Sequence, residues 1–224
     1  MIDKRVASLA TAVADIKDGS TVLCSGFGSV GEPQELMDAL IEQGARDLVI
    51  VANNAGVGDV GLAGLIKAGR VRKIICNYPR TRDPHCFDAA YRAGKIELEL
   101  VPQGTMSERI RAGGAGIAGF YTRVSAGTEV AAGKEVREFG GHPHVFEEAI
   151  RGDVALIKAD RADRWGNLVY RKSARNFNPV MATAAALTIA QVRETVELGT
   201  LDPEHVHTPG IFVDRVVVTP QGAT

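Results

Sequence analysis

Three glycines in residues 25–31, Gly26, Gly28 and Gly31, follow the apolar run 21–24 with the spacing G-x-G-x-x-G. Such a loop lets backbone N–H groups approach a ligand, and a helix that starts behind it adds the positive end of its dipole. This arrangement suits an anionic or carbonyl-bearing ligand. The same glycines also serve a tight turn that only lets a strand and a helix pack, so the spacing by itself leaves both interpretations open.

Two features of the surrounding sequence argue against a dinucleotide as the ligand. In the NAD-binding fingerprint the last glycine packs within the first helical turn, and an acidic residue about 20 positions later contacts the ribose. Here Pro33 marks a helix that begins after Gly31, and the next apolar run ends in Asn53 and Asn54 instead of a carboxylate. The loop is therefore predicted to face a different ligand.

These candidate residues need a scaffold that brings them together, and the order of sequence patterns predicts one. Between residues 20 and 114, apolar β-type runs alternate with helical patterns, which is typical of a parallel sheet. The runs cover residues 21–24, 47–54, 72–78 and 96–103. Ligands of such sheets bind at the carboxyl ends of the strands. We therefore expect one shared site formed by segments 25–31, 53–56, 77–82 and 103–105.

The helix predicted between the first two runs has clear start and stop signals. Residues 33–43 place four apolar side chains on one face, Leu36, Met37, Leu40 and Ile41. Pro33 suits the first helical position, and Gly44 suits a C-terminal cap. Gly69 and Gly94 are expected to end the next two helices in the same way.

The pattern changes after residue 116. Residues 118–152 are rich in glycine with short β-type pieces, and we interpret them as a β-rich excursion. Parallel-type runs then resume with 153–160, a turn at 165–167, a helix from about Pro179, and the runs 191–198 and 211–218. We expect residues 1–224 to form a single α/β domain, a mainly parallel open sheet with helices on both faces plus this excursion.

The composition argues against nucleic acids and membranes as binding partners, and the first residues indicate the cellular compartment. The 26 Lys and Arg residues nearly balance the 27 Asp and Glu residues, so the net charge of −1 predicts no general attraction to nucleic acid or to an anionic membrane. The least polar segment, 180–190, is too short to span a bilayer. The first residues have the spacing of an amphipathic helix instead of a signal peptide, which predicts a cytoplasmic protein.

The cysteines and histidines show no metal-binding pattern. Cys24, Cys76 and Cys86 are widely spaced and predict reduced, buried thiols. The pairs His142/His144 and His205/His207 lack a nearby set of carboxylates or thiolates, so we interpret them as loop histidines and expect no metal.

Several segments of the chain resemble the class I coenzyme A-transferases. The first is the glycine-loop signature from Asp18-Gly19 through Cys24-Ser25-Gly26-Phe27 to Gly31 and Pro33, although the usual form begins Gly-Gly-Phe and Ser25 departs from it. The others are ARDLVIVANNAG, YRAGKIELELVPQGTMSERIRAGGAG, DRWGNLVYRKSARNFNP and LGTLDPEHVHTPGIFVDRVV. The resemblance covers nearly the whole chain and is closest to the A subunits of two-subunit 3-oxoacid CoA-transferases.

This resemblance implies a reaction and a partner. CoA would move from succinyl-CoA to a 3-oxoacid, with 3-oxoadipate preferred over acetoacetate, through a glutamyl-CoA thioester and ping-pong kinetics. The resemblance places the nucleophilic glutamate on the B subunit, so this chain would be half of an enzyme, in an A2B2 assembly. Succinyl-CoA and CoA would act as substrates, and no permanently bound cofactor is implied.

The resemblance also implies roles for individual residues. Asn53 and Gln103 would lie near the reacting carboxylates, where neutral amide donors can stabilise a developing oxyanion without adding a fixed charge. The CoA-facing loop would consist of Ser25, Gly26, Phe27, Gly28, Ser29, Val30 and Gly31.

Three charged positions receive other interpretations. Glu108 ends the pattern T-x-x-E that begins at Thr105, which predicts a capping box at a helix start and not a nucleophile. Glu32, just before Pro33, is as consistent with a solvated helix N-terminal charge as with a ligand-facing group. Arg80 and Arg82 are suited to a distal carboxylate or a CoA phosphate, but a solvated loop is the preferred interpretation.

Two other function classes remain as alternatives. A Rossmann-type protein that holds a nucleotide and regulates a partner would use the same glycine loop. A phosphosugar isomerase on a related α/β layout would need carboxylate and lysine groups at the strand ends, where this chain has amides.

Overall fold

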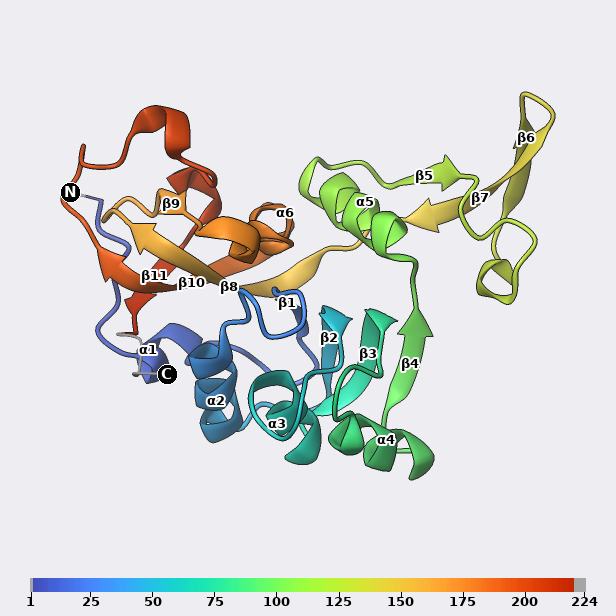
Figure 1. Ribbon diagram of the computed structural model, residues 1–224, viewed down its shortest axis with the longest axis horizontal. Helices are drawn as coiled ribbons and strands as arrows, with labels where there is room; N and C mark the ends of the chain where they lie inside the picture. The colour runs from blue at the N-terminus through green and yellow to red at the C-terminus, as the bar shows by residue number, and fades with distance from the viewer. Residues whose placement is uncertain (1, 220–224) are drawn as a thin grey trace.

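The structure, a computed structural model, describes residues 2–219 and is built on an eight-stranded sheet (Figure 1). The strand order is β11-β10-β8-β1-β2-β3-β4, and all six neighbouring pairs are parallel. Their bounds are Thr21–Cys24 (β1), Leu48–Asn54 (β2), Val71–Tyr78 (β3), Glu97–Leu100 (β4), Gly152–Ala162 (β8), Ala185–Thr195 (β10) and Arg215–Val218 (β11). A two-residue strand, β9 (Leu168–Val169), pairs antiparallel with β8. The predicted mainly parallel sheet is confirmed.

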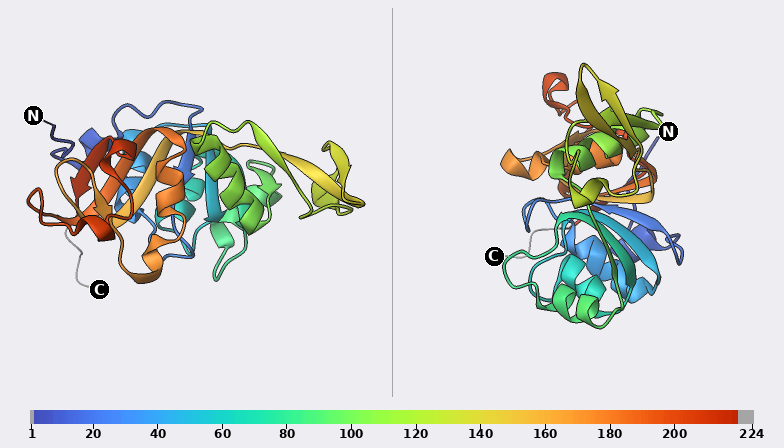
Figure 2. Two further views of the ribbon diagram at one scale, coloured as in Figure 1. Left: turned by 90° about the horizontal axis from the view of Figure 1, so that it is seen from above. Right: turned by 90° about the vertical axis from the view of Figure 1, so that its right-hand side faces the viewer.

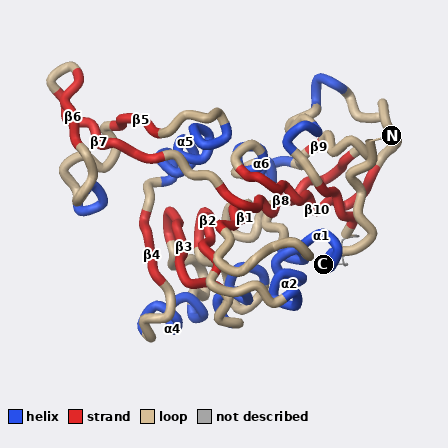
Figure 3. The backbone as a smooth tube through the Cα atoms, turned by 180° about the vertical axis from the view of Figure 1, so that it is seen from behind, coloured by secondary structure: helices blue, strands red, loops and turns tan. Residues whose placement is uncertain are grey.

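The connections change direction between β1 and β8. From β1 the chain proceeds outward to β4, and it later returns to β8 on the other side of β1 and proceeds outward to β11. The view from behind shows β4, β3, β2, β1, β8 and β10 in this order (Figure 3). The central position of β1 explains why its segment is so apolar: Val22 and Leu23 are fully buried between neighbours on both sides.

Helices cover both faces of the sheet, as predicted (Figure 1). One face carries α1 (Leu9–Val13), α2 (Gln34–Gln43), α3 (Gly61–Lys67) and α4 (His85–Arg92). The other face carries α5 (Gln103–Gly114) and α6 (Asn178–Ala182). Each layer has its own apolar core, with Leu36 and Leu40 in the first and Met106 and Ile110 in the second.

The glycine stop signals are confirmed, and several predicted bounds are corrected. Gly44 has a φ of 99° and donates its N–H to the Leu40 carbonyl, as a C-terminal cap should. Gly69 and Gly94 also have positive φ values, 67° and 65°. Pro33 is the residue before α2 and not its first residue. The N-terminal helix is confined to α1, and β10 begins at Ala185, six residues before the predicted run 191–198.

The predicted β-rich excursion forms a three-stranded antiparallel sheet that projects from the body (Figures 1 and 2). Its order is β5-β7-β6, and these strands have the bounds Gly119–Thr122 (β5), His142–Glu148 (β7) and Val136–Phe139 (β6). We call this sheet and its connections, residues 119–148, the arm. Arg109 of α5 fastens the arm to the body, because its Nε donates to the Glu148 carbonyl at 2.6 Å and its Nη1 lies 3.0 Å from Glu99 Oε1 on β4.

Short 3₁₀ helices complete the described chain. They are η1 (Glu129–Ala131), η2 (Lys172–Arg175), η3 (Pro203–His205) and η4 (Gly210–Phe212). Among residues 2–219, no helix combines the length and the apolar character that crossing a membrane requires.

Candidate functional site

The glycine loop lies at the carboxyl end of β1, where the predicted strand run also ends. Gly26, Gly28 and Gly31 have φ values of 123°, 62° and 74°, a region that favours glycine. Gly31 has a second reason to be glycine: a Cβ there would lie 2.8 Å from the Ala174 carbonyl oxygen. The loop is thus shaped both by its backbone turns and by a close neighbour from the second half of the chain.

Ser25, the departure from the usual Gly-Gly-Phe, has a defined place in this loop. Its side chain is 4% exposed, and its Oγ donates to the Gly31 carbonyl at 3.3 Å. Its backbone N–H donates to the Leu156 carbonyl of β8 at 3.1 Å. The hydroxyl therefore ties the two ends of the loop together. By contrast, Phe27 and Val30 at the loop tip are 54% and 46% exposed, which leaves apolar surface around the site.

A chain of carboxamides follows β2 and β3. Asn53, 8% exposed, donates from Nδ2 to the Asn77 Oδ1 at 2.9 Å, and Asn77 donates in turn to the Val101 carbonyl at 2.8 Å. Asn54 accepts the N–H of Gly56 at 2.8 Å, which is a local turn bond, and its Nδ2 donates to the Asn53 Oδ1 at 3.4 Å. Asn77 begins the segment 77–82 that was expected at the site, but its contact with Asn53 was not predicted from the sequence.

Gln103 and Asn53 lie in separate cavities on the two sides of the glycine loop. Gln103 begins α5 and borders a cavity of about 310 Å³, together with Phe27 and Asn176. Asn53 borders a smaller cavity with Ser25 and Gly26. The structure therefore brings each predicted amide to the loop but does not bring the two amides into one cavity.

Glu32 lies in the smaller cavity and is not the solvated charge considered from the sequence. Its Oε1 accepts the N–H of Leu62 at 3.2 Å, at the start of α3. Burial raises the pKa of this carboxyl above its ordinary value, although the bond from Leu62 partly opposes that shift. The carboxyl connects the glycine loop to the segment that follows β2.

The capping box predicted at Thr105 and Glu108 is wrong. Helix α5 begins two residues earlier, at Gln103, because Pro102 provides the turn into the helix. Thr105 is buried within the first turn, and its Oγ1 has no hydrogen-bond partner among the described residues. Glu108 is exposed and pairs with Arg111 at 2.8 Å. It makes a surface ion pair on the helix.

The remaining candidate residues make surface ion pairs or local hydrogen bonds. Arg80 pairs with Asp88 at 2.8 Å on the surface, and the exposed Arg82 follows it in the same loop.

The histidines of the segment 205–207 make local hydrogen bonds. His207 accepts the Tyr170 N–H at 3.0 Å, and His205 contacts Asp202 at 2.7 Å. Residues 2–219 hold no cluster of three or more metal-ligating side chains.

The cysteines are free and buried, as predicted. Burial raises the pKa of the Cys24 thiol strongly and that of Cys76 to about 12, so both thiols are protonated at neutral pH.

The segment 171–178 holds the glycine loop from the side of β8, a role that sequence reasoning missed. Asn176 donates from Nδ2 to the Val30 carbonyl at 3.0 Å, and Asn178 donates to the Gly31 carbonyl at 3.2 Å. Asn178 is fully buried and also accepts the Lys158 N–H at 2.7 Å. In the sequence, the only sign of this role was the pair of asparagines in residues 176–178, NFN.

The chain is similar to several known proteins. The model of the family described as Coenzyme A transferase matches residues 6–219. The chain is 58% identical over 217 residues to the A subunit of 3-oxoadipate CoA-transferase from Pseudomonas putida, over 97% of this chain and 94% of that protein. It is 49% identical to the A subunit of a probable succinyl-CoA:3-ketoacid coenzyme A transferase from Bacillus subtilis, over 96% of this chain and 90% of that protein.

Solved structures show the same fold. The apoenzyme of the acyl-CoA transferase YdiF from Escherichia coli O157:H7 superposes with a TM-score of 0.85 at 26% identity, over 97% of this chain and 47% of that longer chain. Glutaconate coenzyme A-transferase from Acidaminococcus fermentans gives a TM-score of 0.87 at 23% identity, over 97% of this chain and 76% of that chain.

Proposed function

Because this chain belongs to the coenzyme A transferase family, we propose that it is one half, the A subunit, of a two-protein enzyme that moves CoA from succinyl-CoA to 3-oxoadipate. The observation that carries this proposal is the 58% identity, over 97% of the chain, to the corresponding half of a 3-oxoadipate CoA-transferase. The arrangement of the site supports it, since the carboxamides of Asn53 and Gln103 border cavities on the glycine loop, at one edge of the sheet.

In the proposed reaction, a glutamate carboxylate supplied by the B subunit, the partner protein, attacks the thioester carbonyl of succinyl-CoA. CoA leaves as a thiolate, and a mixed anhydride between the glutamate and succinate remains. The thiolate then attacks the glutamyl carbonyl and releases succinate, which leaves a glutamyl-CoA thioester. The 3-oxoacid carboxylate reverses these steps and departs as its CoA thioester, which accounts for ping-pong kinetics.

This chain would supply donors for the oxyanion that forms at each attack. Asn53 has two N–H groups on its amide, and its hydrogen bond to Asn77 uses one of them and holds the side chain in place. Gln103 borders the other cavity, so it would contact a different part of the bound substrate. Such preorganised neutral donors stabilise developing charge more than water does, because they need no reorganisation during the reaction.

We also propose that the enzyme assembles in the cytoplasm as A2B2, with the nucleophile on the B subunit. Glu32, the carboxyl group nearest to the loop glycines in the smaller cavity, is held by the Leu62 N–H. This bond supports a structural role for Glu32 and the supply of the nucleophile by the partner.

The test is co-expression of this chain with the B subunit encoded beside it. The purified complex is expected to form 3-oxoadipyl-CoA from succinyl-CoA, as measured by chromatography of the CoA esters, whereas each protein alone is inactive. Turnover by this chain alone would contradict the proposal that the B subunit supplies the nucleophile. Hydroxylamine or borohydride should convert the thioester-bearing glutamate of the partner to a hydroxamate or an alcohol with release of CoA, which mass measurement locates, and a regulatory nucleotide-binding protein would show no such modification.

Acetoacetate is the second candidate acceptor. The 49% identity to one half of a probable succinyl-CoA:3-ketoacid coenzyme A transferase favours it. Comparing the two acids with the same complex decides between them, and equal kcat/KM values would remove the preference for 3-oxoadipate.

A further inference from the structure

A cavity lies at the point where the connections of the main sheet change direction. In open α/β sheets, ligands bind in the crevice at the carboxyl ends of the strands where the order reverses, which here is between β1 and β8. The structure has a cavity of about 360 Å³ at this place, with Val30 and Gly31 of the glycine loop on one side. Lys158 and Asp160 of β8 and the segment 171–174 form the other side.

The walls of this cavity are positively charged. Asp160 is already paired with Arg193 at 2.9 Å, and Lys158 lies 3.9 Å from Glu35. Arg171 and Lys172 are exposed, and neither makes an ion pair within residues 2–219. Two cations therefore border the cavity without a compensating carboxylate.

The backbone holds one of these cations in an unusual conformation. Lys172 has a φ of 51°, which is uncommon for a residue other than glycine and persists only where neighbours impose it. Asn176 donates to the Ser173 carbonyl at 2.9 Å, and Asn178 donates to the Ala174 carbonyl at 2.8 Å. The same two side chains hold the glycine loop, so the segment carrying the cations and the loop are one connected unit.

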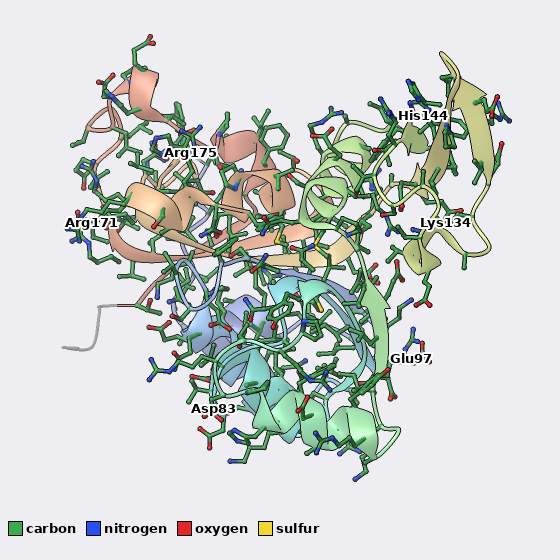
Figure 4. All side chains as sticks on the ribbon, turned by 45° about the vertical axis from the view of Figure 1, so that its right-hand side comes forward. Asp83, Glu97, Lys134, His144, Arg171 and Arg175 are labelled. Carbon is green, nitrogen blue, oxygen red and sulfur yellow. The ribbon has the colours of Figure 1, made fainter. Side chains whose placement is uncertain are left out.

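Figure 4 shows where this unit lies. Arg171 and Arg175 are on the part of the molecule away from the arm, which carries Lys134 and His144. The segment with the cations therefore lies away from the arm, and it borders the glycine loop at Val30 and Gly31.

We propose that this cavity binds the distal carboxylate of dicarboxylic acyl substrates, with Arg171 and Lys172 as specificity-determining residues; this inference rests on the proposed function. A guanidinium presents paired N–H groups that match a carboxylate, and the ammonium adds a second positive charge. Succinate and 3-oxoadipate both end in a second carboxylate, and acetoacetate does not. A volume near 360 Å³ suits a short acid chain, at the small end of the range for ligand sites.

The test uses the co-expressed complex and two substitutions in this chain, Arg171→Gln and Lys172→Gly, singly and together. Glycine adopts a positive φ readily, so Lys172→Gly removes the ammonium without new backbone strain. In ping-pong kinetics, kcat/KM for the acceptor reports the second half-reaction alone. We expect the double variant to lower kcat/KM for 3-oxoadipate by roughly 10–100-fold and to leave kcat/KM for acetoacetate within about twofold of the wild-type complex.

Arg72→Gln is the matched control. Arg72 is also an exposed arginine without an ion pair in the described chain, but it lies at the start of β3, far from the cavity along the sheet order. Both acids should keep their wild-type kcat/KM in this variant. Thermal melting of each complex shows whether the variants are folded.

Several results would overturn the inference. An equal loss for both acids would mean that the cations hold the loop or bind CoA. A reduced kcat/KM with acetoacetyl-CoA as donor would assign the cations to a CoA phosphate, since that donor has no distal carboxylate. An unchanged ratio of the two acids in an active complex would remove the carboxylate site and leave the proposed function intact, whereas a wild-type complex inactive on both acids would refute the proposed function.

Discussion

Asn178 and Gly31, 147 residues apart in the sequence, are joined by a hydrogen bond from the asparagine Nδ2 to the glycine carbonyl at 3.2 Å. Asn178 is fully buried, and its Oδ1 accepts the Lys158 N–H at 2.7 Å. This one side chain therefore connects the glycine loop, β8 and the start of α6.

Replacing Asn178 by alanine should destabilise the protein considerably. It would remove the side-chain partners of the Lys158 N–H and the Ala174 carbonyl and one of the two donors to the Gly31 carbonyl, at a cost of roughly 2–4 kcal/mol in the free energy of unfolding. Urea denaturation measures this change. The neighbouring Asn176→Ala is the control, since Asn176 is only half-buried and should cost less than about 1 kcal/mol. Equal losses in the two variants would show that the burial of Asn178 is not what matters.

Removing the Asn53 side chain should slow the reaction more than it affects substrate binding. Asn53→Ala in the complex with the partner protein is expected to lower kcat by roughly 100-fold, because an oxyanion donor is lost. Asn77→Ala keeps that donor but removes the acceptor 2.9 Å from it, and a smaller loss, of roughly 10-fold, should follow. Steady-state kinetics on both variants shows which one has the larger loss of kcat. A larger loss in Asn77→Ala than in Asn53→Ala would contradict the prediction.

The half-buried Glu32 carboxyl should make stability depend on pH. Burial raises its pKa in the folded state above the ordinary value of 4.5, so between these two pKa values the folded state binds more protons than the unfolded state. The stability that Glu32 contributes is therefore fully present below about pH 4.5 and declines as the pH rises through the raised pKa.

Glu32→Gln is the variant that tests this pH dependence. Glutamine can still accept the Leu62 N–H but does not ionise. The variant should gain stability relative to the wild-type protein as the pH increases from about 5 to about 8, when urea unfolding is measured across that range. A difference that stays constant with pH would exclude the titration of Glu32 as the cause.

Arg109 is expected to be essential for the attachment of the arm. Its side chain lies within 3.0 Å of Glu99 and 3.7 Å of Glu147, which is 1% exposed. Arg109→Ala should cost roughly 2–3 kcal/mol, since it removes the hydrogen bonds to the Glu148 carbonyl and to Glu99, while the buried Glu147 carboxylate keeps Lys134 at 2.7 Å. Arg111→Ala on the same helix breaks only an exposed pair and should change stability by less than about 1 kcal/mol. Similar values for both would argue against a buried network.

Local patterns predicted the scaffold well. The run 21–24 coincides with β1, the run 47–54 lies within one residue of β2, and Gly44 caps α2 as expected. The T-x-x-E pattern misled because threonine and glutamate three residues apart also occur inside a helix, and Pro102 starts α5 earlier. The start of β10 was missed because its first residues, such as Ala185 and Ala186, have no β preference of their own.

The sequence by itself determined the order of elements, the parallel sheet and the segments at its carboxyl edge, because these depend on periodicity and on residues close together in the chain. Tertiary structure decided which side chains surround the glycine loop. The Glu32 carboxyl is held by the Leu62 N–H, Asn178 is joined to Gly31, and the cationic cavity exists because β8 returns beside β1. Such contacts join residues far apart in the chain, and no local pattern encodes the distance between them.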